Sequence, residues 1–289
     1  MPAPPLIERL RVLLVLGRIS NLPTVWSNCL AAWILSGGGP LQPFLLLCLG
    51  ATFLYTGGMF LNDAFDVEFD RKYRAERPII SGQVSLRFVW IAGGALLCLG
   101  WFALFRLSAR TATFGGLLLI CIITYNAVHK STSLAPLLMA GCRFLLYLVA
   151  GSAAQAGAGS SVIWFASALL CYIVGLSYLA RVESTAGIVS HWPAFLLLLP
   201  LVFAISYCGK PGAQLWAAVS IQALWVLWCL SGGYSSAKRF LSSGVAGLLA
   251  GIPLVDWLAV SCRLPVDLAL AFPAFLLLAL LLQRVAPAT

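Results

Sequence analysis

Three aspartates with helical spacing form the most acidic part of this sequence. Asp63, Asp66 and Asp70 lie in FLNDAFDVEFDRKYRAERPIISGQVS, residues 60–85. On one continuous helix, about 100° per residue places the three side chains within roughly 60° of arc, with Asn62 at the edge. Like charges on one stripe repel unless a cation lies between them, and hard oxygen ligands suit Mg²⁺. The spacing therefore predicts a Mg²⁺ site built from these three carboxylates and Asn62.

A basic cluster follows directly after the aspartates, formed by Arg71, Lys72, Arg74 and Arg77. Mg²⁺ bound by a few carboxylates commonly completes its coordination with substrate phosphates. Arginine and lysine hold phosphate oxygens through charge-assisted hydrogen bonds. The acids and bases together predict a diphosphate site. The other interpretation is an amphipathic loop with solvated charges whose bases anchor the topology, and spacing alone leaves both open.

The composition predicts the elements that must position these side chains. Hydrophobic residues make up 61% of the chain and charged residues 9%, against roughly 25% charged residues in a soluble domain. Runs approaching the roughly 20 apolar residues that cross a bilayer as a helix recur along the chain. We predict an all-α, polytopic integral membrane bundle of nine or ten transmembrane helices. The expected spans lie near 19–36, 43–62, 87–105, 111–128, 134–155, 161–180, 193–208, 213–231, 240–258 and 266–283.

The net charge of +9 reflects membrane topology. With a cytoplasmic N-terminus, thirteen of the eighteen lysines and arginines fall on the cytoplasmic side, as the positive-inside rule expects. These are Arg9, Arg11, Arg18, Arg71, Lys72, Arg74, Arg77, Arg87, Lys130, Arg181, Lys238, Arg239 and Arg284. The bases are not gathered on one solvated face, which argues against nucleic acid as a partner. The acidic segment is expected at the cytoplasmic boundary.

Other residues that can do chemistry are scattered. The nine cysteines include no CxxC pair, so we expect apolar packing rather than metal or disulfide roles. His129 and His191 lack metal-ligand spacing and are expected to be structural. Arg143 falls within a predicted span, where a charged side chain usually faces the bundle interior and carries function.

The acidic segment resembles a known family motif. The pattern N-D-x-x-D-x-x-x-D, residues 62–70, is similar to the first aspartate-rich motif of the UbiA superfamily of intramembrane prenyltransferases. The resemblance extends over roughly residues 15–150. It includes Asp70-Arg71, Arg77-Pro78, Ser81-Gly82 and Ser85 in a D-R…R-P…S-G-x-x-S pattern, LGRISNLPT (17–24) and TYNAVHKSTSLAPLLMAGCR (124–143).

The resemblance implies a single UbiA-like domain over residues 1–289 in the bacterial inner membrane. It implies a Mg²⁺-dependent transferase that moves a prenyl group from a prenyl diphosphate to a lipophilic acceptor, surrounded by membrane lipid. Asp66, Asp70, Arg181 and Glu183 are then the expected catalytic residues. The expected substrate-binding residues are Asn21, Asn62, Arg77, Tyr125, Lys130, Arg143 and Tyr178.

One part of the sequence departs from the family pattern. Members carry a second aspartate-rich motif, but GLSYLARVESTAGIVSHWP (175–193) contains no aspartate, and Glu183 is its only acid. This departure and the SNLPTVWSN opening resemble a divergent, EboC-type branch. A non-catalytic lipid or isoprenoid carrier that keeps the fold is therefore the alternative function. A CDP-alcohol phosphotransferase is disfavoured, because no glycine separates the acids at 63–70.

Overall fold

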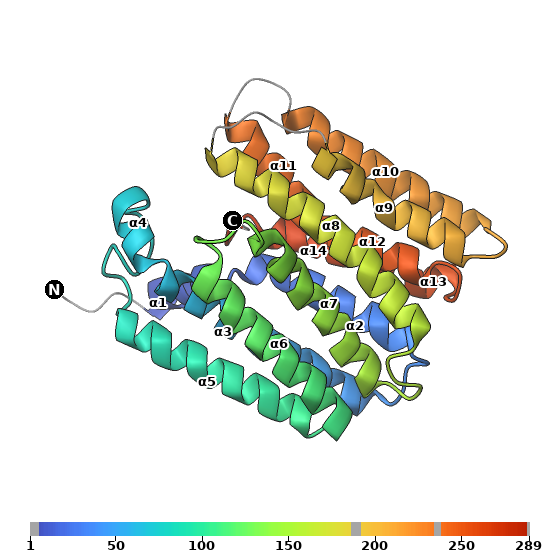
Figure 1. Ribbon diagram of the computed structural model, residues 1–289, viewed down its shortest axis with the longest axis horizontal. Helices are drawn as coiled ribbons and strands as arrows, with labels where there is room; N and C mark the ends of the chain where they lie inside the picture. Colours follow the sequence, from blue (N-terminus) through green and yellow to red (C-terminus); the bar gives the residue numbers. More distant parts are fainter. Residues whose placement is uncertain (1–5, 186–191, 234–237, 288–289) are drawn as a thin grey trace.

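The computed structural model describes residues 6–185, 192–233 and 238–287, and all regular structure in these ranges is helical (Figure 1). The chain forms a bundle of long helices from which the short helix α4 projects at one end (Figure 1). The helices are α1 (Leu6–Leu16), η1 (Ile19–Asn21), α2 (Leu22–Leu35), α3 (Leu41–Phe65), α4 (Val67–Tyr73), α5 (Leu86–Phe105), α6 (Ala109–Val128), α7 (Ala135–Ala153), α8 (Ser160–Thr185), α9 (Trp192–Tyr207), α10 (Ala213–Gly233), α11 (Lys238–Ala250), α12 (Ile252–Val260), α13 (Val266–Ala269) and α14 (Ala271–Leu282).

The bundle has the apolar helices of an integral membrane protein. Among the described residues, six helices are long and apolar enough to cross a membrane, namely α3, α5, α6, α7, α8 and α10. Shorter apolar stretches occupy Trp192–Tyr207, Gly244–Val260 and Val266–Leu282. Large apolar side chains are exposed on these helices, Trp228 and Leu224 each to 66%, as expected for surfaces that face lipid.

The first predicted span, 19–36, corresponds to η1 and α2 and follows a sharp turn of the chain. Arg18 adopts a left-handed conformation (φ 42°, ψ 53°) between α1 and η1, so the chain turns before α2 begins. Pro23 lies in the first turn of α2, where its missing N–H costs no helical hydrogen bond. The turn matters because it directs Arg18 toward the end of α3.

Glycines let α3 and α5 pack closely. A Cβ added at Gly57 would lie 2.8 Å from the carbonyl oxygen of Gly93, and one at Gly100 would lie 2.9 Å from that of Gly50. Small residues at such crossings allow helix backbones to approach in membranes. This contact positions the end of α3. That end carries Asn62 and Asp63, the first two residues of the Mg²⁺ site expected from the sequence.

The expectation for the cysteines was wrong at one pair. Cys208, after α9, and Cys262, after α12, form a disulfide. The ends of α9 and α12 lie at the end of the bundle opposite α4, near α13 (Figure 1). The disulfide could not be predicted, because the two residues are 54 positions apart and their neighbours resemble ordinary span ends.

Candidate active site

The aspartate stripe forms at the junction of α3 and α4. The structure ends α3 at Phe65 and begins α4 at Val67, so the single continuous helix expected here is interrupted at Asp66. The interruption is slight, since the amide of Asp66 still donates to the carbonyl of Asn62 (3.0 Å) and that of Asp70 to Asp66 (2.8 Å). Asn62 and the three aspartates are all buried, with 3–7% of each residue exposed.

Asp63 is held by two arginines from different parts of the chain. Its Oδ1 lies 3.6 Å from Nη2 of Arg18 and 3.6 Å from Nη1 of Arg77. Arg18 comes from the turn before α2, and Arg77 from the loop after α4. The same Arg18 nitrogen donates to Oδ1 of Asn62 at 3.4 Å. Arg77, one of the bases expected to meet a diphosphate, therefore lies beside the acidic stripe, and Arg18 adds a second base.

Asp66 faces the end of α6. Its Oδ1 lies 3.2 Å from Nε2 of His129, and its Oδ2 lies 3.2 Å from Nζ of Lys130. The Lys130 ammonium also lies 4.0 Å from the centre of the Phe69 ring. Burial opposes ionisation of Asp66, but the hydrogen bond and charge of His129 and the charge of Lys130 outweigh it and lower the pKa of this carboxyl.

We expected His129 to have a structural role and did not predict its contact with Asp66. Nδ1 of His129 lies 3.2 Å from the carbonyl oxygen of Asn126, which fixes the ring, and Tyr125 stacks on it with ring centres 5.0 Å apart. Asn126 also ties α6 to α3, because its side chain donates to the carbonyl of Gly58 (3.0 Å) and accepts from Asn62 (3.2 Å). The sequence signal for the contact of His129 with Asp66 was the position of His129 beside Lys130 at the end of a predicted helix.

Asp70 differs from the other two aspartates. It is 3% exposed, and its buried Oδ1 has no hydrogen-bond partner. Burial raises the pKa of Asp70 above its ordinary value, Arg77 and Arg74 lower it in part, and the charges of Asp66 and Asp63 raise it further. An orphaned buried carboxylate oxygen is costly unless a cation or donor meets it.

The donor set fits a Mg²⁺ that shares its ligands with a substrate. In the described residues no three acidic, histidine or cysteine side chains converge closely enough to hold a metal by themselves. Mg²⁺ is usually bound by one or two carboxylates and completes its shell with waters and phosphate oxygens. Asp70, with its unpartnered oxygen, and Asp66, one turn away, can supply those carboxylates.

The remaining predicted site residues lie in several places. Nη1 of Arg181 donates to the carbonyl of Thr132 (3.1 Å), just past the α6 end that carries Lys130. Tyr178 packs edge-on against Trp192 with ring centres 4.8 Å apart. Asn21 is buried in η1. Glu183 belongs to α8, but its side chain lies outside the described residues, as do residues 186–191 of the departing segment.

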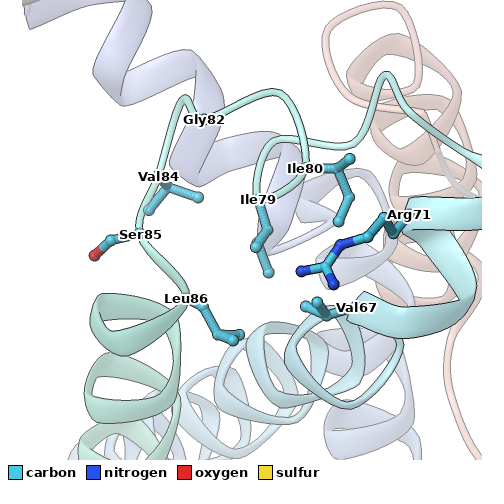
Figure 2. A pocket seen from close by; sticks show the side chains of 8 residues that line it. All are labelled: Val67, Arg71, Ile79, Ile80, Gly82, Val84, Ser85 and Leu86. Atoms are coloured by element: carbon cyan, nitrogen blue, oxygen red, sulfur yellow. The ribbon is translucent and has the colours of Figure 1, made fainter.

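A separate pocket of about 430 Å³ lies between α4 and the loop that follows it (Figure 2). Val67 and Arg71 line it from α4, and Arg71 points its guanidinium into it (Figure 2). The loop side is formed by Ile79, Ile80, Gly82, Val84, Ser85 and Leu86. None of the aspartates lines this pocket, so Arg71 faces away from the acidic stripe that Arg77 contacts.

The fold and site define an integral membrane helical protein with a buried acidic stripe matched by bases at one end of its bundle. Residues 21–190 match the UbiA prenyltransferase family, and the chain belongs to that family. This confirms the family resemblance of the aspartate motif.

Relatives and solved structures agree with this assignment. The chain is 28% identical over 170 residues to a 4-hydroxybenzoate octaprenyltransferase of Albidiferax ferrireducens, a match that spans 56% of this chain and 57% of the relative. It is 25% identical to a Legionella pneumophila protein of the same name, over 84% of this chain and 91% of the other. A UbiA homologue from Archaeoglobus fulgidus, solved with GPP and Mg²⁺, has the same fold, with a TM-score of 0.61 at 14% identity over 86% of this chain and 99% of that one.

Proposed function

We propose that this protein is an intramembrane transferase that moves a prenyl group from a prenyl diphosphate to a lipophilic acceptor with Mg²⁺. The observation that carries the proposal is the unpartnered, buried oxygen of Asp70 beside carboxylates already matched by bases. The family membership, the names of the relatives and the GPP and Mg²⁺ of the Archaeoglobus structure support the same reaction class.

The chain's own residues suit each part of this reaction. The allylic C–O bond breaks with its electron pair leaving on the diphosphate, the acceptor forms the new bond to the allylic carbon, and the acceptor's proton passes to water. Bound Mg²⁺ would neutralise charge on the departing diphosphate. Arg77 and Lys130, 3.6 and 3.2 Å from their carboxylates, can donate to phosphate oxygens from opposite sides of the stripe. Asp66 and Asp70 would hold the metal.

The wider architecture belongs to the same proposal. We infer a single domain over residues 1–289 that crosses the bacterial inner membrane nine or ten times. The N-terminus and the acidic stripe are then cytoplasmic, and the charge distribution supports this orientation. The EboC-type branch stays a prediction that rests on the segment without aspartate at 175–193.

The test is Mg²⁺-dependent binding and turnover of geranyl diphosphate by the purified protein. Asp66→Ala and Arg77→Ala should each weaken binding at least tenfold, which corresponds to about 1.4 kcal/mol. Glu68→Ala is the matched control, because Glu68 is an exposed acid on the same short helix. Unchanged affinity in both site variants would refute a diphosphate site here. Binding without turnover across aromatic and lipid acceptors would instead favour the carrier, which the segment without aspartate motivates.

A further inference from the structure

A stripe of buried polar side chains runs along one face of η1 and α2. Thr24, Ser27 and Asn28 are fully buried, and Asn21 is 6% exposed. Spacings of three, four and seven residues place these side chains on one face of a helix. Polar groups inside a membrane bundle are costly and usually mark a functional site. These buried side chains need hydrogen-bond partners. Two charged residues on other helices, Asp256 and Arg143, contact them.

Asp256, on α12, is the acidic partner. It is fully buried, and each of its oxygens accepts hydrogen bonds. Ser27 and Asn28 donate to Oδ2, the latter at 2.8 Å, and the hydroxyl of Tyr147 donates to Oδ1. Three donors around one carboxylate stabilise its charged form.

Arg143, on α7, is the basic partner. Its Nη1 donates to Oδ1 of Asn28 at 2.7 Å, and its Nη2 donates to the hydroxyl of Thr24 at 2.9 Å. The amide of Asn28 thus bridges the guanidinium and the carboxylate of Asp256, so the two buried charges compensate each other. A guanidinium has five N–H donors, and these two contacts leave donors for a ligand on this part-buried side chain.

This network is connected to the aspartate stripe through the segment that holds Arg18, η1 and α2. Arg18, which contacts Asp63, immediately precedes η1, and Tyr55 donates to the carbonyl of Arg18 at 3.3 Å. Thr24 follows Arg18 by six residues, across the turn and η1. A molecule whose polar end meets Arg143 can thus extend toward the diphosphate end.

We propose that Arg143 binds the polar end of the acceptor, and that Asp256 makes this subsite select an uncharged hydroxyl or amide group over a carboxylate. The inference rests on the proposed transferase function. Its physical reason is charge balance. A carboxylate added beside a guanidinium that is already compensated leaves one net negative charge in an interior of low dielectric constant. A neutral group can accept the remaining N–H donors without that penalty.

The matched probes are 4-hydroxybenzamide and 4-hydroxybenzoate, which differ in charge but little in size. Affinities for both are measured on protein loaded with geranyl diphosphate and Mg²⁺. The wild type should bind the amide at least tenfold more tightly. Asp256→Asn, which leaves the Arg143 charge uncompensated, should shift the preference at least tenfold toward the carboxylate. Asp267→Asn is the control, because it makes the same change at an exposed site on α13.

A second pair of variants decides the case if Asp256→Asn does not fold. Arg143→Gln should lose at least tenfold in affinity for the amide, and Arg143→Lys should restore part of it. Geranyl diphosphate binding is measured on every variant as a check of folding, and the control Asp267→Asn should bind it as the wild type does.

The outcomes separate the two proposals. A wild type that does not bind geranyl diphosphate refutes the proposed function. A wild type that binds geranyl diphosphate but neither probe, or prefers the carboxylate, overturns the inference alone. Selectivity that is unchanged in Asp256→Asn, or amide affinity that is unchanged in Arg143→Gln, also overturns it.

Discussion

Asp70 allows a prediction in which stability and ligand binding change in opposite directions. Its carboxylate is buried with an unpartnered oxygen, so the ionised group destabilises the metal-free protein. An unsatisfied buried polar group typically costs about 1–3 kcal/mol. Asp70→Asn removes the charge at constant size, and we expect it to raise the free energy of unfolding of the metal-free protein by up to this amount at neutral pH.

The same substitution should impair binding of the substrate with its metal. Loss of one contact to a charged group, about 1.5–3 kcal/mol, corresponds to a roughly ten- to hundredfold weaker affinity for geranyl diphosphate with Mg²⁺. The assay is thermal unfolding in detergent with and without these ligands. Ligand should stabilise the wild type strongly and Asp70→Asn weakly, and Glu68→Gln should behave as the wild type.

The pH dependence fixes the sign of the effect. Because the pKa of Asp70 is raised in the folded protein, the folded state retains this proton more tightly than the unfolded state. The contribution of Asp70 to the free energy of unfolding therefore falls as the pH rises through the raised pKa. The gain from Asp70→Asn should be full above that pKa and disappear below the ordinary value of about 3.9. If Asp70→Asn instead destabilises the metal-free protein at neutral pH, Asp70 has a structural partner and the reasoning is wrong.

Two further predictions concern the scaffold. Gly57→Ala should destabilise the protein by about 1–3 kcal/mol in thermal unfolding, because the new Cβ would lie 2.8 Å from the Gly93 carbonyl oxygen. Gly94→Ala, with nothing within 4 Å of its Cβ, should be neutral or stabilising, and equal effects would contradict the close α3–α5 contact. The thiols of Cys208 and Cys262 should react with a membrane-impermeant maleimide only after reduction. After reduction, they should react from the side of the membrane opposite to the side from which a Glu68→Cys thiol reacts. Labelling of Cys208, Cys262 and the Glu68→Cys thiol from the same side would contradict the inferred orientation.

Much of the fold could be predicted from the sequence, because long apolar runs identify membrane helices. The apolar runs located the six long helices, and the aspartate spacing located the stripe, but the ion pair of Asp63 with Arg77 was not predicted. The breaks were harder to predict. The left-handed turn at Arg18 and the interruption at Asp66 depend on tertiary contacts, and neither position carries a glycine or proline that would mark it.

Contacts between distant segments could not be predicted from one sequence. The contacts of Asp256 could not be predicted, because its partners Ser27 and Tyr147 are 229 and 109 positions away. The contact of His129 with Asp66 could not be predicted either, because the two residues belong to different segments of the bundle. In both cases the chemistry arises from helices brought together by packing, and periodicity within a single helix carries no information about that pairing.

The distribution of bases around the stripe suggests how the proposed site, with one acidic motif, would bind a diphosphate and balance its charge. Asp63 and Asp66 are matched by Arg18, Arg77 and Lys130 at 3.2–3.6 Å, whereas Asp70 keeps an unpartnered oxygen. Asp70 would offer this oxygen to a metal bound with the diphosphate. As Asp66 turned to the metal, Lys130 would become available to phosphate oxygens. We infer that the carboxylates and bases neutralise each other in the free protein and exchange partners when substrate binds. Such an exchange places positive charge on the leaving group without a second cluster of acids.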